Sequence, residues 1–294
     1  MKPYSPKYYK SFKCKADKCT HSCCVGWEID IDEDTLSLYR ALEGGYGEKV
    51  KSSISYEDMP HFKLLCDERC PHLDEKGLCR IILSLGEDHL CHICREHPRF
   101  YNYVGDRTEA GLGMACEEAC RIILSSDDYG VEGGATPLPE TVRIREGIYS
   151  LISDTSLPYA ARLETVYSRY GVWPSVISDV RWKNLLSSLE YMDPSHKDAF
   201  SCYSSAVVPM PEYEDVLRRA LAYFIYRHCT EAFTAEEYRA CLGFCLFCER
   251  LFASLLYAEK PEVDEDIIRI ARTLSEEIEY SEDNTDTVKS IFYS

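Results

Sequence analysis

The chain has 294 residues, of which 45% are hydrophobic and 28% charged, with 16 cysteines and a formal net charge of −17. This length and composition predict a globular protein of one or two domains. The acidic balance argues against a basic face of the kind that binds phosphates, so we expect no nucleic-acid partner.

The N-terminal residues show no apolar stretch followed by a small-residue cleavage site, and no run of 18 apolar residues occurs. We therefore expect no signal peptide, no transmembrane helix and no membrane partner. Cysteine usage this high in a reducing compartment is more typical of metal binding than of disulfides. The sequence thus predicts a cytoplasmic protein with reduced thiols.

Eleven of the 16 cysteines lie in the first 120 residues, and Cys14, Cys19, Cys23 and Cys24 have the spacing C-x4-C-x3-C-C. Periodicity and turn residues predict a few short elements in this irregular segment. In chain order they are a strand over 27–31, a helix over 34–42, a turn over 73–78 and a β-hairpin formed by 99–104 and 107–112.

Turn-forming residues are concentrated in 125–138, which predicts a linker. Beyond it the hydrophobic pattern is helical almost throughout, and Thr234 and Glu237 have the spacing of a capping box. The expected helices cover 139–152, 158–170, 180–192, 212–233, 234–258 and 263–280. The predicted fold is mainly α: an irregular cysteine-rich metal-binding module with a short β-hairpin at 1–124, followed by a helical domain at 139–294.

Thiolates at short spacings converge readily on a metal ion or an iron–sulfur cluster. Four of them complete one zinc ion or one [4Fe–4S] cluster, so nine suit two sites, or one cluster and a second site. Spacing does not separate zinc from iron, and a purely structural zinc module is the alternative to a functional cluster. The candidate ligands are Cys14, Cys19, Cys23, Cys24, Cys70, Cys79, Cys91, Cys94 and Cys116, with His21, His72, His89, His92 and His97 as possible replacements.

A second motif, C-x3-C-x2-C at Cys241, Cys245 and Cys248, has the spacing found in radical S-adenosylmethionine enzymes. It lies late in the chain, in a predicted helix where Leu and Phe flank the cysteines, so we interpret the three as core residues. The apolar run 223–226 is interpreted as core by the same periodicity. No glycine-rich dinucleotide fingerprint occurs, which disfavours an ordinary Rossmann methyltransferase.

Two segments within residues 10–122, FKCKADKCTHSCCVGWEIDID and CPHLDEKGLCRIILSLGEDHLCHICREHPRFYNYVGDRTEAGLGMACEEACR, resemble the flagellin lysine-N-methylase family. That family belongs to a wider group with a CxxCxxCC zinc- or iron-chelating domain. The resemblance implies methyl transfer from S-adenosylmethionine to lysine side chains of flagellin, by a protein that holds an iron–sulfur cluster. The nine candidate cysteines match the family's cysteine pattern, whereas Cys66 and Cys120 are extra.

The leading hypothesis is therefore an S-adenosylmethionine-dependent protein-lysine N-methyltransferase with a [4Fe–4S] cluster, zinc being the alternative metal. A zinc-stabilised interaction or scaffold protein without catalytic activity is an alternative of a different class, and a redox partner is a third. The sequence assigns no catalytic residue, no donor-binding residue and no oligomeric state.

Overall fold

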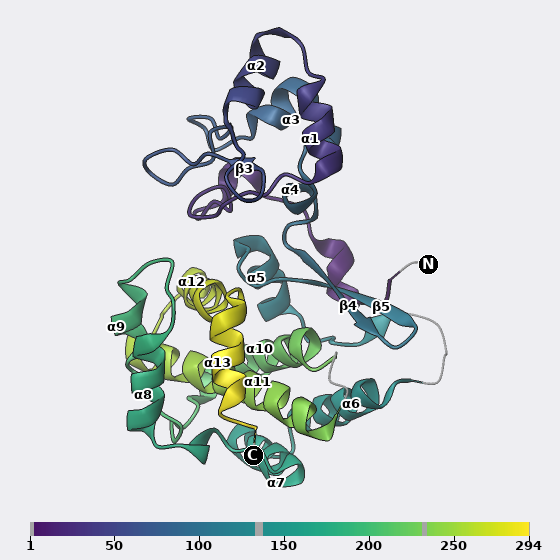
Figure 1. Cartoon of the computed structure of the whole chain (residues 1–294). Helices are drawn as coiled ribbons and strands as arrows, with labels where there is room; N and C mark the ends of the chain where they lie inside the picture. The colour runs from purple at the N-terminus through teal and green to yellow at the C-terminus, as the bar shows by residue number, and fades with distance from the viewer. Residues whose placement is uncertain (1–2, 133–137, 231–233, 294) are drawn as a thin grey trace. The chain divides into compact units, whose positions relative to one another are not determined.

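The computed structural model describes residues 3–132, 138–230 and 234–293, and the chain divides into two compact units. Unit 1 comprises Met1–Phe12 together with Phe100–Ser294, and unit 2 comprises Lys13–Arg99. Helices dominate the described residues, where strands form only short two-stranded pairs (Figure 1). The predicted mainly α fold class is confirmed.

Unit 2 consists of short helices and turns around a small core. Its elements are the 3-10 helix η2 (Ala16–Lys18), α1 (Glu33–Arg40), α2 (Gly44–Ser52), β2 (Ile54–Ser55), β3 (His61–Phe62), α3 (Arg80–Leu85), the 3-10 helix η3 (Glu87–His89) and α4 (His92–Glu96). The buried core is formed by Ile29, Ile31, Leu36, Tyr39, Val50, Ile54, Phe62, Cys70, Ile81 and Cys91. Two cysteines are therefore core residues of this unit.

Helix α1 confirms the helix predicted over 34–42. Asp32 caps its N-terminus, because the carboxylate accepts hydrogen bonds from the Thr35 amide at 2.9 Å and the Thr35 hydroxyl at 2.8 Å. Leu36 and Tyr39 are buried one turn apart and fix the helix against the core.

The strand predicted over 27–31 is wrong as an extended element. Ile29 and Ile31 are buried on alternate positions, as expected for a strand. Only an isolated bridge between Asp30 and His61 forms there, because the partner strand β3 is two residues long. The alternating sequence pattern therefore reflects burial of one face of this segment, and no further strand pairing extends the single bridge.

Unit 1 contains most of the helices. Its elements are β1 (Ser5–Pro6), η1 (Lys7–Ser11), β4 (Arg99–Val104), β5 (Arg107–Leu112), α5 (Glu117–Ser125), β6 (Val131–Glu132), α6 (Glu140–Ile152), α7 (Tyr159–Tyr170), η4 (Pro174–Val176), α8 (Asp179–Ser188), α9 (His196–Phe200), η5 (Pro211–Tyr213), α10 (Glu214–His228), α11 (Ala235–Glu259), α12 (Asp264–Leu274), a π-helix (Ser275–Glu279) and α13 (Glu282–Ser290). Strand β1 pairs with β6 antiparallel, and β4 pairs with β5.

Helices α10 and α11 pack against each other in the middle of unit 1, with α5, α6, α12 and α13 beside them (Figure 1). The capping box of α11 is present: the Thr234 hydroxyl accepts from the Glu237 amide at 3.1 Å, and the Glu237 carboxylate accepts from the Thr234 amide at 2.8 Å. Within the described residues, α11 alone is long and apolar enough to cross a membrane, but 89% of its apolar window is buried inside the protein. It is the core helix of unit 1.

The core interpretation of the late cysteines is confirmed for Cys245 and Cys248, which are fully buried among aromatic residues of α11, while Cys241 packs half-buried against the same core. The run 223–226 is buried as well. A small thiol in such a core packs as an apolar group.

Most predicted helices of unit 1 are present with shifted ends. The helix over 180–192 ends earlier, at Ser188, and the helix over 263–280 leaves α-geometry at Ser275. The end of the helix predicted over 212–233 and part of the linker predicted over 125–138 lie outside the described residues. Among the helices that the pattern missed are α5, α9 and α13; α13 buries mainly Asn284, Thr285 and Val288, which give no apolar stripe.

The β-hairpin of β4 and β5 is confirmed, and it belongs to unit 1 together with α5. Leu112 of β5 and Cys120 of α5 are fully buried in the same core as α10 and α11. The compact unit 2 is therefore shorter than the predicted 1–124 module. As a division into functional modules, 1–124 and 139–294 stays a prediction.

A buried ion pair joins the hairpin to α6. Arg145 donates two hydrogen bonds to the Glu109 carboxylate, at 2.6 Å and 2.9 Å, and both side chains are fully buried. Arg107 donates to the same carboxylate at 2.6 Å, so two guanidinium groups share one counter-ion. Burial opposes the charge of Arg145, but the hydrogen bonds with Glu109 raise its pKa above the usual value.

We predict that Glu109→Gln destabilises unit 1 by about 3–5 kcal/mol, because two buried guanidinium groups lose their counter-ion while the side-chain shape is kept. Denaturant unfolding measures the change. Arg121→Ala, which removes an exposed pair with Glu118, is the control and should cost at most about 1 kcal/mol. Equal effects of the two substitutions would contradict the importance of the buried pair.

Candidate cysteine site

The structure distributes the nine candidate cysteines over both units. Eight belong to unit 2, and Cys116 belongs to unit 1. All 16 cysteines are among the described residues, and none is in a disulfide.

Five cysteines gather in and around the core of unit 2. Cys70 and Cys91 are buried, with 6% and 1% of their surface exposed, and Cys24, Cys79 and Cys94 pack partly buried against the same core. We call Cys24, Cys70, Cys79, Cys91 and Cys94 the thiol cluster. Cys79 and Cys91 each immediately precede a helix, α3 and α4, where backbone N–H groups favour a thiolate.

The two cysteines of the C-x2-C pair, Cys91 and Cys94, are joined by a hydrogen bond. A hydrogen bond from the Cys94 thiol lowers the pKa of Cys91, and the same hydrogen bond, together with burial, raises the pKa of Cys94. Cys91 is thus the member that ionises first. A thiolate is the form of cysteine that binds a metal.

The pKa values of the other members of the thiol cluster also depend on their neighbours. Burial, with smaller contributions from the neighbouring Cys24, Cys79 and Cys91, raises the pKa of Cys70 to about 12. Burial likewise raises the pKa of Cys79, with Cys24 and Cys91 adding to it. A hydrogen bond with Cys23 lowers the pKa of Cys24 to about 7, against burial and with help from Ser22 and Arg69. A bound cation would relieve this mutual repulsion, so the donor chemistry fits a thiolate-ligated metal.

The thiol cluster has the donor chemistry of a metal site, but its side chains are not arranged as a complete set of ligands. Across residues 3–132, 138–230 and 234–293, no group of three or more His, Cys, Asp or Glu side chains is arranged to hold a metal ion. Cys14 and Cys23 are exposed and Cys19 is half-buried, so of the opening C-x4-C-x3-C-C run only Cys24 packs against the core. The structure brings five of the candidates together, and the assignment of all nine as ligands stays a prediction.

The histidines, which the sequence treats alike, differ in the structure. His72 is fully buried and both ring nitrogens are engaged, Nδ1 with the Tyr46 hydroxyl at 3.1 Å and Nε2 with the Ser53 hydroxyl at 2.9 Å. Burial, with Lys49 nearby, lowers its pKa to about 4, so it is neutral and structural. His89 instead has a buried Nδ1 atom without a hydrogen-bond partner in the structure, which leaves it a nitrogen for a ligand.

Two residues that the sequence did not single out hold the thiol cluster in place. The Tyr39 hydroxyl donates to the His89 carbonyl at 2.6 Å and lies 3.5 Å from the Cys91 sulfur. The Asp32 carboxylate accepts from the His92 amide at 2.8 Å and so ties the start of α4 to the start of α1. The helix pattern places Tyr39 on a buried face, but no local signal reveals partners 50 and 60 residues away.

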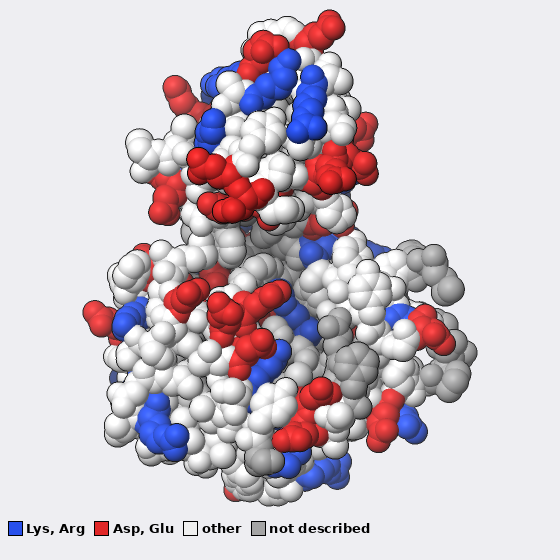
Figure 2. Space-filling model, in the orientation of Figure 1, with Lys and Arg blue, Asp and Glu red and all other residues white. Residues whose placement is uncertain are grey.

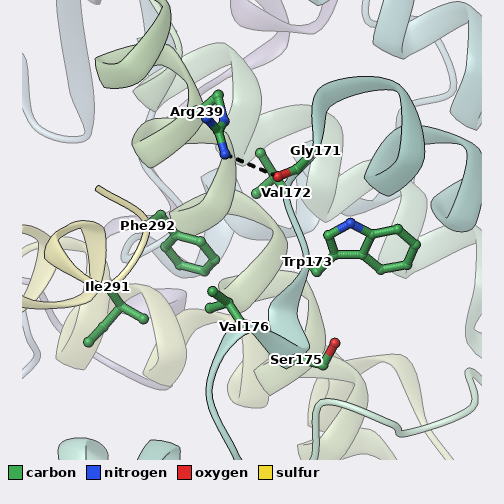
Figure 3. Close-up of a pocket in the computed structure, with 8 residues that line it drawn as sticks. All are labelled: Gly171, Val172, Trp173, Ser175, Val176, Arg239, Ile291 and Phe292. Carbon is green, nitrogen blue, oxygen red and sulfur yellow. Dashed lines mark hydrogen bonds between the residues drawn. The ribbon is translucent and has the colours of Figure 1, made fainter. Parts of the chain in front are cut away.

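Unit 1 has a surface pocket of its own, shown in Figure 3. Val172, Trp173, Val176, Ile291 and Phe292 form its apolar walls, and it encloses about 350 Å³. The polar groups at its rim include the Arg239 guanidinium, which donates to the Gly171 carbonyl at 3.3 Å. Its size is that of a small-molecule site. None of its lining residues is a candidate cysteine.

Comparison with known proteins finds sequence similarity over part of the chain. It is 28% identical over 132 residues to the flagellar biosynthetic protein FliU of Salmonella muenchen, a stretch that covers 42% of this chain and 77% of FliU. It is also 28% identical over 137 residues to the proteins named Lysine-N-methylase of Salmonella typhimurium and Salmonella choleraesuis, again over 42% of this chain. The match covers 32% of each Lysine-N-methylase, so the chain spans about a third of their length.

No family model and no solved structure matches the chain. The similarity to the two proteins named Lysine-N-methylase nevertheless agrees with the family resemblance carried by the cysteine pattern. The chain is therefore a relative of the lysine-N-methylases.

Proposed function

We propose that this protein is a protein-lysine N-methylase that transfers a methyl group from S-adenosylmethionine to lysine side chains of flagellin. The similarity to proteins named Lysine-N-methylase is the observation that carries the proposal. The name of FliU, a flagellar biosynthetic protein, supports flagellin as the substrate. A cytoplasmic location, in which the thiols stay reduced, is part of the same proposal.

A polar methyl transfer, as opposed to a radical one, sets one requirement on the protein. The substrate ammonium, with a reference pKa of about 10.4, must lose its proton before the nitrogen lone pair is available. Removing it from water lowers this pKa toward neutrality. The lone pair then attacks the methyl carbon of the sulfonium, a C–N bond forms, and the C–S electron pair moves to sulfur, which leaves S-adenosylhomocysteine.

The thiol cluster of unit 2 is the proposed place of the metal. Four of the five cysteines Cys24, Cys70, Cys79, Cys91 and Cys94 would supply the thiolates for a [4Fe–4S] cluster, or for zinc as the alternative metal. Such a cluster would supply a positive, redox-active centre of iron ligated by sulfur. The residues themselves supply burial and a Cys91 thiolate that forms ahead of Cys94.

A surface of matching charge supports a lysine-bearing substrate. Figure 2 shows acidic side chains over the region of α12 and α13. These two helices carry the exposed Asp264, Glu265, Glu282 and Asp283 in their first turns. A negative surface raises the local concentration of a basic substrate. The same charge also keeps the protein soluble, so this surface agrees with the proposal without carrying it.

A zinc-stabilised interaction module without catalytic activity is the second candidate. The observation that favours it is the small core of unit 2, in which two of the buried residues are cysteines. A unit with so little apolar core depends on additional bonds for its stability, and structural zinc commonly supplies them. Measurements of the bound metal and of methyl transfer distinguish the methylase from the zinc-stabilised interaction module.

We predict that Cys91→Ser and Cys94→Ser each reduce the metal content of anaerobically purified protein and unfold unit 2, because metal-binding free energy is folding free energy there. Elemental mass analysis and hydrogen exchange of residues 13–99 measure the two effects. Cys66→Ser, at an exposed position outside the predicted set, is the matched control and should change neither.

In the same series, Cys245→Ala should cost about 1–2 kcal/mol as a small truncation in the core of unit 1 and leave the metal content unchanged. If Cys245→Ala and Cys91→Ser behaved alike in both measurements, the division into ligand and core cysteines would be wrong.

We predict that the wild-type protein transfers the labelled methyl group of S-adenosylmethionine to purified flagellin, detected by mass spectrometry as methylated lysines. Cys94→Ser should abolish transfer, and Cys66→Ser should retain it. Protein that holds stoichiometric zinc and transfers no methyl group to flagellin would instead support the interaction module.

A further inference from the structure

Two cysteines of unit 1 lie in contact where its two central helices meet. Cys229 is the residue at which α10 ends, and its amide still donates to the Ile225 carbonyl at 3.0 Å. Cys245 lies inside α11. Their sulfur atoms are 3.7 Å apart, and both side chains are fully buried. We call Cys229 and Cys245 the core thiol pair.

The separation of the two sulfur atoms suits a disulfide. A disulfide bond holds its sulfur atoms about 2.05 Å apart, and two cysteines whose side chains point apart cannot form one. The sulfur atoms of the core thiol pair already face each other, and rotation of the two side chains closes the remaining gap. Both cysteines belong to unit 1, so the pairing needs no movement of one unit against the other.

A buried hydroxyl without a partner lies near the core thiol pair. Tyr238, in the first turn of α11, is 5% exposed, and its hydroxyl has no hydrogen-bond partner among the residues that the structure describes. Burial raises the pKa of Tyr238, and the neighbouring Cys229 and Cys245 thiols add to the rise. A buried hydroxyl left unpaired is costly, and a redox role is one explanation for such a group. The O–H of Tyr238 is a donor for a thiolate that forms beside it.

The hydrogen bond within the core thiol pair indicates which sulfur reacts first. Burial raises the pKa of Cys245, and the hydrogen bond with Cys229 adds to the rise. Cys245 therefore keeps its proton and donates, and the Cys229 sulfur accepts. Because the thiolate is the nucleophilic form of cysteine, Cys229 is the attacking sulfur.

We infer that the core thiol pair is a redox modification site, at which a peroxide converts Cys229 and Cys245 into a reversible disulfide between α10 and α11. The inference is independent of the proposed function, since none of the residues involved belongs to the thiol cluster of unit 2. It gives these two cysteines a role beyond packing as small apolar groups.

The oxidant is hydrogen peroxide, and two steps complete the reaction. The Cys229 thiolate attacks one peroxide oxygen, an S–O bond forms and the O–O bond breaks, and the departing hydroxide takes up the proton that Cys229 released. The products are a sulfenic acid and water. The Cys245 sulfur then attacks the Cys229 sulfur, the S–O bond breaks, and the hydroxide leaves with the Cys245 proton as a second water. The two sulfur atoms are oxidised, and the two peroxide oxygens are reduced.

Burial makes this oxidation slow compared with that of exposed thiols. Peroxide reaches the core thiol pair when the structure opens locally, and Cys229 lies at the end of α10, where helices open more readily than at their centres. The exposed Cys66 should therefore react faster. Arg227 and His228, in the last turn of α10, contact the buried Glu279 carboxylate at 3.0 Å and 3.1 Å. A disulfide at Cys229 would fix the helix end that carries both groups.

The test is cross-link mapping by mass spectrometry on the full chain. Protein treated with hydrogen peroxide, unfolded in iodoacetamide and digested with trypsin without reductant should yield residues 228–239 joined to residues 240–250. Dithiothreitol should reverse the cross-link. Cys229→Ala and Cys245→Ala should each lose it. Cys241→Ala and Cys248→Ala, which remove the other two cysteines of the second peptide, are the matched controls and should retain it.

The rate of cross-linking tests the role of Tyr238. Tyr238→Phe should slow the reaction by about tenfold, the size expected for a lost hydrogen bond to a charged group. Tyr213→Phe, which removes a hydroxyl that donates to the Pro261 carbonyl at 2.9 Å, should leave the rate unchanged. An unchanged rate in Tyr238→Phe would overturn the role of Tyr238.

Three results would overturn the disulfide itself. They are no cross-link after Cys66 has been fully oxidised, a cross-link that persists in Cys245→Ala, and a cross-link that forms only in unfolded protein. None of these measurements uses methyl transfer or bound metal, so failure of the proposed function would leave the inference standing.

Discussion

The burial of several thiols in one small core is the constraint on which unit 2 depends. Cys70 and Cys91 occupy core positions that an apolar residue would fill in an ordinary domain, and Cys94 lies against the same core. Burial and neighbouring thiols raise the pKa of Cys70 to about 12, so several thiolates do not coexist there without a compensating cation. A metal bound to the thiol cluster, as proposed above, would therefore couple its binding to the folding of this unit.

Hydrogen bonds with Asp32 and Tyr39 hold the C-x2-C pair of unit 2 in place. Asp32 caps α1 and also accepts from the first amide of α4, and Tyr39 of α1 bonds the carbonyl two residues before Cys91. The C-x2-C pair is thus held by groups that are not ligands. Outer contacts of this kind orient ligands and influence affinity almost as strongly as the ligands do.

Local signals predicted much of the fold. The capping box of α11, the Asp32-capped helix α1 and the hairpin of β4 and β5 each depend on residues a few positions apart, and each is confirmed. The missed elements depend on distant partners. Helix α13 has no apolar stripe; it is held by Asn284, whose side chain donates to the Glu190 carbonyl at 2.7 Å, 94 residues away.

The candidate site follows the same rule. Cysteine spacing predicts nine candidate ligands, but it does not predict that Cys24 alone of the opening run packs with Cys70 and Cys91 at the core of unit 2, or that Cys116 belongs to unit 1. Long irregular connections lie between these residues, and spacing along the chain says little about distance across such connections. The same limit hid the difference between His72 and His89, which only their hydrogen bonds reveal.

Unit 1 raises the question of why a helical core contains ionised carboxylates. A buried ion pair is weak evidence for stability, since apolar residues of similar volume often stabilise a core as well or better. Glu279 therefore needs a reason beyond stability, and its geometry supplies one: a carboxylate that accepts from Tyr223, Arg227, His228 and Ser275 has one orientation. An apolar side chain would fill the same volume and leave the Tyr223 hydroxyl free to rotate away from the Met114 amide, which donates to it at 3.1 Å. The buried charge thus gives the loop before Cys116 a direction that packing alone does not specify.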